Sequence, residues 1–222
     1  MIEFLKGYQD NLGAWLPEFL LASWQTLKLM ALAFCLATVI GLAIALARGS
    51  QLKALRAFAV FYIEVIRGIP ALVILFWVYF GLPSVGLSPT SYTAAVLGLG
   101  IHGGAFLAEV FRSGIEALHK GQMEGALALG MTPLKAMRYI ILPQAVRIVL
   151  PPIANYAVGL LKETALCSII AAPELMLRAK DLASSSFLPM QTYVLAALFY
   201  YAMCFPMMRG VEYLEARLRQ GR

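Results

Sequence analysis

The sequence predicts an all-α, polytopic membrane protein with about five transmembrane helices. Three observations support this: the chain is apolar throughout, its apolar residues form long runs, and its basic residues gather between those runs. Of the 222 residues, 61% are hydrophobic and 14% are charged, compared with about 45–50% and about 25% in soluble domains. The mean hydropathy is +0.77. A soluble protein could not bury so many apolar side chains, so the composition argues against a soluble enzyme and against disorder.

Five apolar runs approach the length of about 20 residues that a membrane-spanning helix needs. The first run carries no charge, and Pro70 interrupts the second. In the fourth, Pro151 and Pro152 favour a break. We expect the chain between 173 and 189 to be irregular, and 211–219 to form a short surface helix. The predicted spans are 29–47, 57–80, 93–118, 145–161 and 191–208.

Basic residues are distributed unequally over the two sides of this topology. The loop after the first span, the segment after the third and the C-terminal tail are basic, whereas residues 81–92 contain no Lys or Arg. Because cytoplasmic loops carry the excess of Lys and Arg, we expect the N-terminus outside and the C-terminus in the cytoplasm. No internal repeat is evident, so we expect one domain over 1–222. The scattered basic residues do not predict nucleic-acid binding, and the spacing of Cys35, Cys167 and Cys204 predicts neither a metal site nor a disulfide framework.

The segment after the third span has the pattern of a helix, a corner and a second helix. Residues 122–129 favour a helix, and Gly130 stands where a left-handed residue would end it. Thr132 is suited to cap the next helix, with Pro133 in its first turn. The segment is either an interfacial connector or a docking site whose small side chains let another protein approach closely.

This segment resembles the cytoplasmic loop of integral membrane subunits of ABC importers. That loop has the form E-A-A, three residues, G, nine residues, I-x-L-P. This chain has Glu124, Gly125 and Ala126, then Gly130, and I-I-L-P at 140–143, with the spacing kept; Gly125 replaces the family's usual Ala. The resemblance implies a cytoplasmic coupling helix that binds a separate ATPase. Its implied coupling residues are Gln122, Glu124, Gly125, Ala126, Leu127 and Gly130.

Other motifs resemble the polar amino acid permeases of the histidine, glutamine and arginine type. They are R-G-I-P at 67–70, Y-F-G-L-P at 79–83, L-P-P at 150–152 and K-E-T-A-L at 162–166. Ala165 stands where this subfamily more often has Ser. The similarity covers a core from about residue 23 to residue 213.

The resemblance implies the permease subunit of an ATP-driven importer for polar amino acids, a multi-pass protein of the bacterial inner membrane. Its implied partners are two copies of an ABC ATPase subunit, a second permease subunit that is identical or paralogous, and an extracytoplasmic solute-binding protein. The sequence has no G-x-x-x-x-G-K-[ST] motif, so it cannot bind ATP phosphates through a P-loop. We therefore expect no catalytic residues and no cofactor in this chain, with ATP and Mg on the partner ATPase.

Two alternatives to this function remain open. The first keeps the transporter class and changes the cargo to an opine, cystine or an organic cation. The second is a channel or secondary transporter, which would need a selectivity sequence or inverted repeats, and neither is visible.

Charged residues within the second and third spans need partners, because a charge at the centre of a membrane helix costs about 2.5–3.5 kcal/mol. A rise of 1.5 Å per residue places Arg67 level with Glu109, and Glu64 level with Arg112. We therefore expect two ion pairs between the helices. Alternatively, each acid pairs with the Arg three residues along its own helix.

Several polar residues within the spans are candidates for a substrate pathway. His102 lies among glycines, which suit either tight helix packing or a cavity. Glu163 and Thr164 would line a cavity if the fourth helix is broken there; otherwise they belong to a snorkelling helix end. For Arg67 and Glu109 the alternative is a purely structural ion pair. The candidates are Arg67, His102, Glu109, Asn155, Glu163 and Thr164.

Overall fold

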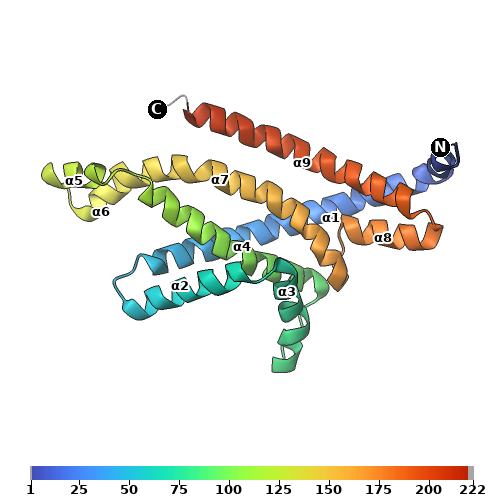
Figure 1. Cartoon of the computed structure of the whole chain (residues 1–222), viewed down its shortest axis with the longest axis horizontal. Helices are drawn as coiled ribbons and strands as arrows, with labels where there is room; N and C mark the ends of the chain where they lie inside the picture. The colour runs from blue at the N-terminus through green and yellow to red at the C-terminus, as the bar shows by residue number, and fades with distance from the viewer. Residues whose placement is uncertain (1, 220–222) are drawn as a thin grey trace.

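The computed structural model describes residues 2–219, and within that range the chain is helical and has no strand (Figure 1), which confirms the predicted all-α class. Four helices are long: α1 (Ile2–Arg48), α4 (Ser91–Glu116), α7 (Leu142–Glu163) and α9 (Pro189–Arg219). The shorter helices are α2 (Lys53–Gly68), α3 (Ala71–Phe76), α5 (Lys120–Ala128), α6 (Pro133–Ala136) and α8 (Leu175–Ser186). Two π-helical turns, Trp77–Gly81 and Met137–Ile141, and two 3-10 segments, Leu82–Val85 and Thr164–Ile170, lie between them.

About five segments are long and apolar enough to cross a bilayer, as predicted. Four are continuous: Asn11–Arg48, Ser91–Glu116, Pro133–Ile170 and Pro189–Leu218. The fifth is the pair Lys53–Gly68 and Ala71–Val85, which is bent by 107°. Pro70 causes the bend, because a proline ring disfavours helical geometry in the residue before it, and Ile69 is accordingly extended, with φ −106° and ψ 134°.

α7 and α9 are longer than the sequence predicted. Pro151 and Pro152 lie inside α7 without ending it, since proline is tolerated in membrane helices. Residues 211–219 continue α9 and do not form a separate surface helix. Asn155 Nδ2 of α7 donates a hydrogen bond of 3.2 Å to Glu215 Oε1 in this part of α9. Val211 in this part of α9 is buried, so apolar packing and the hydrogen bond together keep the end of α9 beside α7.

The chain between 173 and 189 is largely helical, and the prediction of an irregular segment was wrong. α8 begins at the buried carboxylate of Glu174, which accepts hydrogen bonds from two backbone N–H groups of the first turn, at 2.8 and 2.6 Å. Thr26 Oγ1 of α1 accepts a third from Leu175, at 2.9 Å. α1 itself reaches back to Ile2, and this added length provides the surface on which α8 packs.

The two ends of the molecule carry different elements (Figure 1). α5, α6, the junction of α1 with α2, and the C-terminal end of α9 lie at one end. The N-terminal end of α1, α8 and the start of α9 lie at the other. The three basic segments of the sequence therefore share one end, as the predicted orientation requires.

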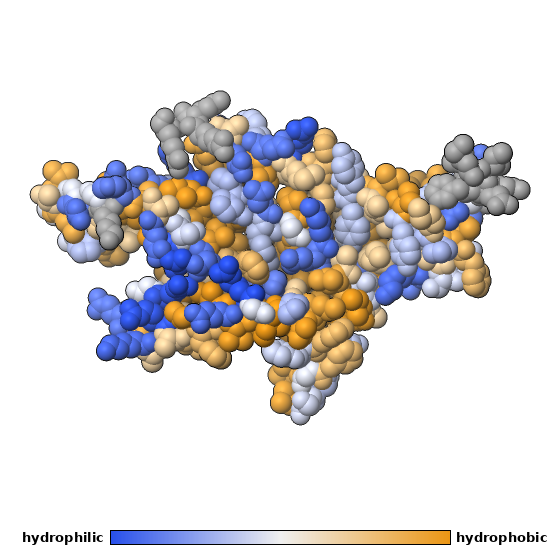
Figure 2. All heavy atoms as spheres, in the orientation of Figure 1, coloured by the Kyte–Doolittle hydropathy of each residue, from blue (hydrophilic) through white to orange (hydrophobic). Residues whose placement is uncertain are grey.

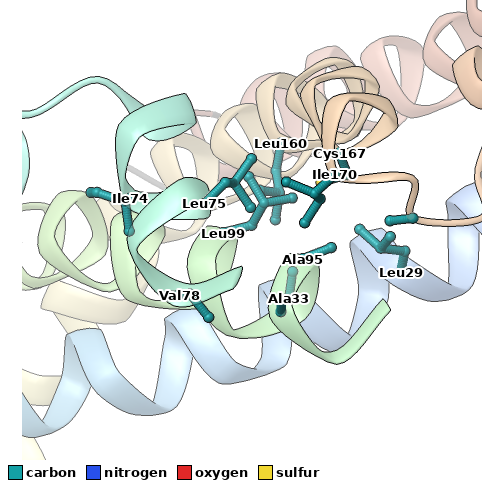
Figure 3. Packing of buried hydrophobic residues seen from close by; sticks show 12 residues of the cluster. Leu29, Ala33, Ile74, Leu75, Val78, Ala95, Leu99, Leu160, Cys167 and Ile170 are labelled. Carbon is teal, nitrogen blue, oxygen red and sulfur yellow. The ribbon is translucent and has the colours of Figure 1, made fainter. Parts of the chain in front are cut away.

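A buried hydrophobic cluster joins α1, α3, α4, α7 and the segment Thr164–Ile170 (Figure 3). Leu75 of α3, Leu99 of α4 and Leu160 of α7 are fully buried in it. This core holds the bent second span against α4 and sets the distance between α4 and α7.

α1 and α4 approach closely because glycines lie between them. A Cβ atom placed on Gly41 of α1 would lie 2.8 Å from Cβ of Leu107 and 3.0 Å from the backbone N of Ala108. A Cβ atom on Gly100 of α4 would lie 2.8 Å from Cγ of Leu36. Small residues at such positions let membrane helices pack tightly. Gly100 of α4 therefore serves close packing against α1, one of the two predicted alternatives for this glycine-rich stretch.

Gly41→Ala is expected to destabilise the protein by about 1–3 kcal/mol, because the added methyl group meets backbone that cannot move aside. Gly13→Ala is the matched control on the same helix, since nothing lies within 4 Å of a Cβ atom there, and alanine favours a helix. Thermal unfolding of the two purified variants in detergent measures the difference. Equal unfolding midpoints would contradict the packing account.

Candidate functional site

The turn between α5 and α6 has the local geometry that the sequence predicts. Gly130 is left-handed, with φ +78°. Its N–H donates to the carbonyl of Leu127 at 2.9 Å, and the N–H of Met131 donates to the carbonyl of Ala126 at 3.1 Å. These two bonds form a Schellman motif, which ends a helix and favours glycine at the left-handed position. Thr132 caps α6, as expected, by accepting a hydrogen bond from the third residue along.

α5 presents small side chains on a surface that this chain leaves uncovered. Glu124, Gly125 and Leu127 are exposed, while Ala126 is buried against the rest of the chain. A Cβ atom on Gly125 would meet nothing within 4 Å. The surface of α5 is thus open to close approach by another protein.

A hydrogen bond connects α5 to the start of α7. Gln144 Nε2 donates to Gln122 Oε1 at 3.4 Å and to the carbonyl of Ile140 at 2.9 Å. α5 begins at Lys120, slightly earlier than predicted, because His119 Nδ1 accepts a hydrogen bond from the N–H of Gly121. Gln144 therefore forms a direct side-chain contact between α5 and α7.

His102 of α4 meets Tyr156 and Glu163 of α7 in a buried polar cluster. His102 Nδ1 lies 3.9 Å from Glu163 Oε2. These two atoms and the Tyr156 hydroxyl are all buried, and none of them has a hydrogen-bond partner in the described part of the chain. A Cβ atom on Gly103 would overlap the Tyr156 hydroxyl, so only glycine there admits the ring. We call His102, Tyr156 and Glu163 the polar cluster.

Contacts through the Phe106 ring connect the polar cluster to Arg67 of α2. The Phe106 ring centroid lies 5.1 Å from that of His102 and 6.3 Å from that of Tyr156. The Arg67 guanidinium lies 5.4 Å from the same Phe106 centroid, within the range of a cation–π interaction. Arg67 is therefore a neighbour of the cluster through Phe106 and does not touch its carboxylate.

Glu109 lies apart from the polar cluster, in an ion-pair network. Its carboxylate accepts a hydrogen bond of 2.8 Å from Arg48 of α1 and also pairs with Arg112 on its own helix. Among the described residues no ion pair joins Arg67 to Glu109 or Glu64 to Arg112, so the predicted pairs between the helices were wrong, and the within-helix alternative is confirmed for Glu109. The rise of 1.5 Å per residue correctly compares depths in the membrane along the second and third spans, but it gives no information about α1. The close packing of α1 on α4 places Arg48 beside Glu109.

Asn155 and Thr164 also lie outside the polar cluster. Asn155 points to α9, where it binds Glu215. Thr164 is fully buried, and its hydroxyl donates a hydrogen bond of 2.7 Å to the carbonyl of Leu161.

Tyr156 is the cluster residue that the sequence analysis missed, although its spacing of seven residues from Glu163 places both on one face of a helix. Among the side chains that the structure describes, no three of His, Cys, Asp or Glu gather closely enough to hold a metal ion.

Tyr156→Phe is expected to leave thermal stability unchanged or raised, because its buried hydroxyl has no hydrogen bond to lose. Tyr62→Phe is the matched control. The Tyr62 hydroxyl donates a hydrogen bond of 2.6 Å to the carbonyl of Ile101. Losing that bond is expected to lower the free energy of unfolding by about 0.5–1.5 kcal/mol. Unfolding midpoints of the two purified variants, without added ligand, provide the comparison. An equal loss in both would mean that the Tyr156 hydroxyl stabilises the fold.

Comparison with known proteins agrees with these features. Residues 11–220 match the family described as "Binding-protein-dependent transport system inner membrane component". The chain is 38% identical over 211 residues to the "Probable glutamine ABC transporter permease protein GlnM" of Bacillus subtilis (strain 168), covering 95% of this chain and 96% of that protein. It is 47% identical over 167 residues to the "Probable amino-acid ABC transporter permease protein YckA" of the same organism, covering 75% and 74%.

A solved structure has the same fold. The "Crystal structure of an amino acid ABC transporter with histidines" superimposes with a TM-score of 0.89 at 37% sequence identity, covering 93% of this chain and 96% of that one. The match therefore extends over nearly all of both chains. The chain belongs to the family of binding-protein-dependent transport system inner membrane components, the multi-pass permease subunits of ABC importers.

Proposed function

We propose that this permease carries polar amino acids into the cell as a homo- or heterodimer with a second permease. Two copies of a separate ATPase would supply the energy, with ATP and Mg bound there, and an extracytoplasmic binding protein would deliver the cargo. Relatives named as glutamine and amino-acid permeases support the cargo class. The observation that carries the proposal is the polar cluster of His102, Tyr156 and Glu163, with its three buried atoms that lack hydrogen-bond partners.

A polar ligand would remove an energetic cost at the cluster. A buried donor or acceptor without a partner costs about 1–3 kcal/mol, and polar groups inside a membrane protein commonly mark substrate pathways. The Glu163 carboxylate suits the ammonium group of an amino acid, while His102 and the Tyr156 hydroxyl suit its carboxylate or a polar side chain. Opines, cystine and organic cations with an ammonium group remain alternative cargoes for the same site.

The second permease is needed to close the pathway. About five spans are too few to surround a translocation path, and the Glu163 side chain is 35% exposed in the single chain. A second copy or a paralogue would cover that open side. Alternating access would then change the side of the membrane to which the path between the two permeases opens.

Coupling would run from α5 through α7 to the polar cluster. α5 would lie in a groove of the ATPase, and its candidate contacts remain Gln122, Glu124, Gly125, Ala126, Leu127 and Gly130. The Gln122–Gln144 hydrogen bond joins α5 to α7. α7 in turn carries both Tyr156 and Glu163. ATP-driven closure of the ATPases would thus move the residues that contact the cargo.

Gly130→Leu is expected to leave membrane insertion intact and to abolish most ATP-driven uptake, because leucine does not tolerate the left-handed geometry that ends α5. Gly130→Asn is the matched control, since asparagine accepts this geometry and should retain most uptake. Binding of the ATPase and amino acid uptake, both in vesicles, are the measurements. If the Gly130→Leu variant bound the ATPase and took up amino acids normally, the turn would have no role in coupling.

Glu163→Gln is expected to weaken amino acid binding by about tenfold or more, because a charged hydrogen bond contributes about 1.5–3 kcal/mol. Equilibrium binding of a radiolabelled amino acid to the purified permease–ATPase complex, without the binding protein, measures this directly. Glu212→Gln is the control: Glu212 is exposed and pairs with Arg209 on its own helix, so binding should stay as in the wild type. Equal affinities in all three proteins would remove Glu163 from the substrate site.

A further inference from the structure

A groove lined by arginine and apolar side chains lies between α1, α2, α4 and α7. It has a volume of about 610 Å³. Its polar part contains Arg48, Arg56 and Arg112, with Glu116 at the end of α4. Neither the polar cluster nor the surface of α5 includes any of these residues, so the groove belongs to neither proposed transport feature.

The polar part of the groove has an excess of positive charge. Glu109 pairs with Arg48 and Arg112, and Glu116 pairs with Arg112. Arg56 has no ion-pair partner in the part of the chain that the structure describes. Three guanidinium groups thus face two carboxylates, and an anion bound between Arg56 and Arg48 would neutralise the remaining positive charge.

The rest of the groove is apolar and opens to the outside of the chain. Leu46 is 68% exposed and Val146 is 43% exposed, although both lie in membrane-spanning segments. Leu42 lies six residues before Arg48, so the apolar wall extends about 9 Å from the guanidinium groups towards the membrane interior. A suitable occupant has an anionic head and an apolar tail in that direction.

The arginines of the groove lie at the depth where lipid headgroups meet the helix ends. They are close to the ends of α1 and α4 and the start of α2, at the end of the molecule that carries α5 (Figure 1). Hydrophilic atoms gather towards this end beside hydrophobic surface (Figure 2). Basic pockets between membrane helices on the cytoplasmic side bind anionic lipid headgroups.

We propose that this groove binds an anionic phospholipid, with its phosphate between Arg48, Arg56 and Arg112 and an acyl chain along Leu46 and Val146. Guanidinium groups form paired, charge-assisted hydrogen bonds with phosphate, which matches the head of the groove. The site is independent of the cargo and of the ATPase contact, so its failure would leave the proposed transport function untouched.

Native mass spectrometry of the purified permease–ATPase complex, titrated with phosphatidylglycerol or with phosphatidylcholine, tests the proposal. We expect the wild type to prefer phosphatidylglycerol and Arg56→Gln to bind it about fivefold more weakly. Lys53→Gln is the matched control: it removes one positive charge one turn earlier on α2, outside the groove, and should bind like the wild type. Equal affinity for both lipids, or equal weakening in the two variants, would overturn the proposal.

Two further measurements separate the lipid from other occupants. Val146→Trp should fill the apolar part and abolish the bound phosphatidylglycerol, and unchanged lipid binding in this variant counts against the site. Inorganic phosphate should fail to displace the lipid, because it lacks the acyl chain; efficient displacement would mean a phosphate site. A Val146→Cys disulfide between two permeases would show that a second copy covers the groove, and would likewise overturn the lipid assignment.

Discussion

The contact between α1 and α4 is the interaction on which the rest of the structure depends. Between membrane helices the hydrophobic effect contributes little, so close van der Waals packing must hold them together. Gly41 and Gly100 permit that packing because neither position has room for a Cβ atom. With α1 fixed on one side of α4, Arg48 reaches Glu109, and α4 presents His102 towards α7.

Three acidic side chains that are buried or partly buried differ in whether their hydrogen bonds are satisfied, and the difference separates structural sites from the candidate binding site. Burial raises the pKa of Glu174, while two backbone N–H groups and the Tyr200 hydroxyl lower it by binding the carboxylate. Glu109 has arginine partners from two helices. Glu163 has a buried oxygen without a hydrogen bond, and the ionisable His102 Nδ1 lies 3.9 Å from it. An acid that the fold leaves unsatisfied is available to a ligand.

Features encoded by neighbouring residues could be predicted from the sequence, and features created by distant contacts could not. The turn at Gly130, the cap at Thr132 and the bend at Pro70 depend on local geometry, and the structure has all three. One of the three hydrogen bonds at the start of α8 joins Leu175 to Thr26, 149 residues away in the chain. Arg48 reaches Glu109 across 61 residues, a contact that counting depth along two helices cannot reveal. Helical periodicity could have identified Tyr156 from the sequence, because its spacing from Glu163 places both residues on one helix face.

The account requires α5 to lie on the cytoplasmic side and to be covered by the ATPase. Leu127 is exposed on α5, so a single cysteine there, in a variant without Cys35, Cys167 and Cys204, reports both properties. A membrane-impermeant maleimide should modify Leu127→Cys in inside-out vesicles, and added ATPase subunit should prevent the modification. Modification from outside intact cells, or labelling that the ATPase does not reduce, would contradict the account.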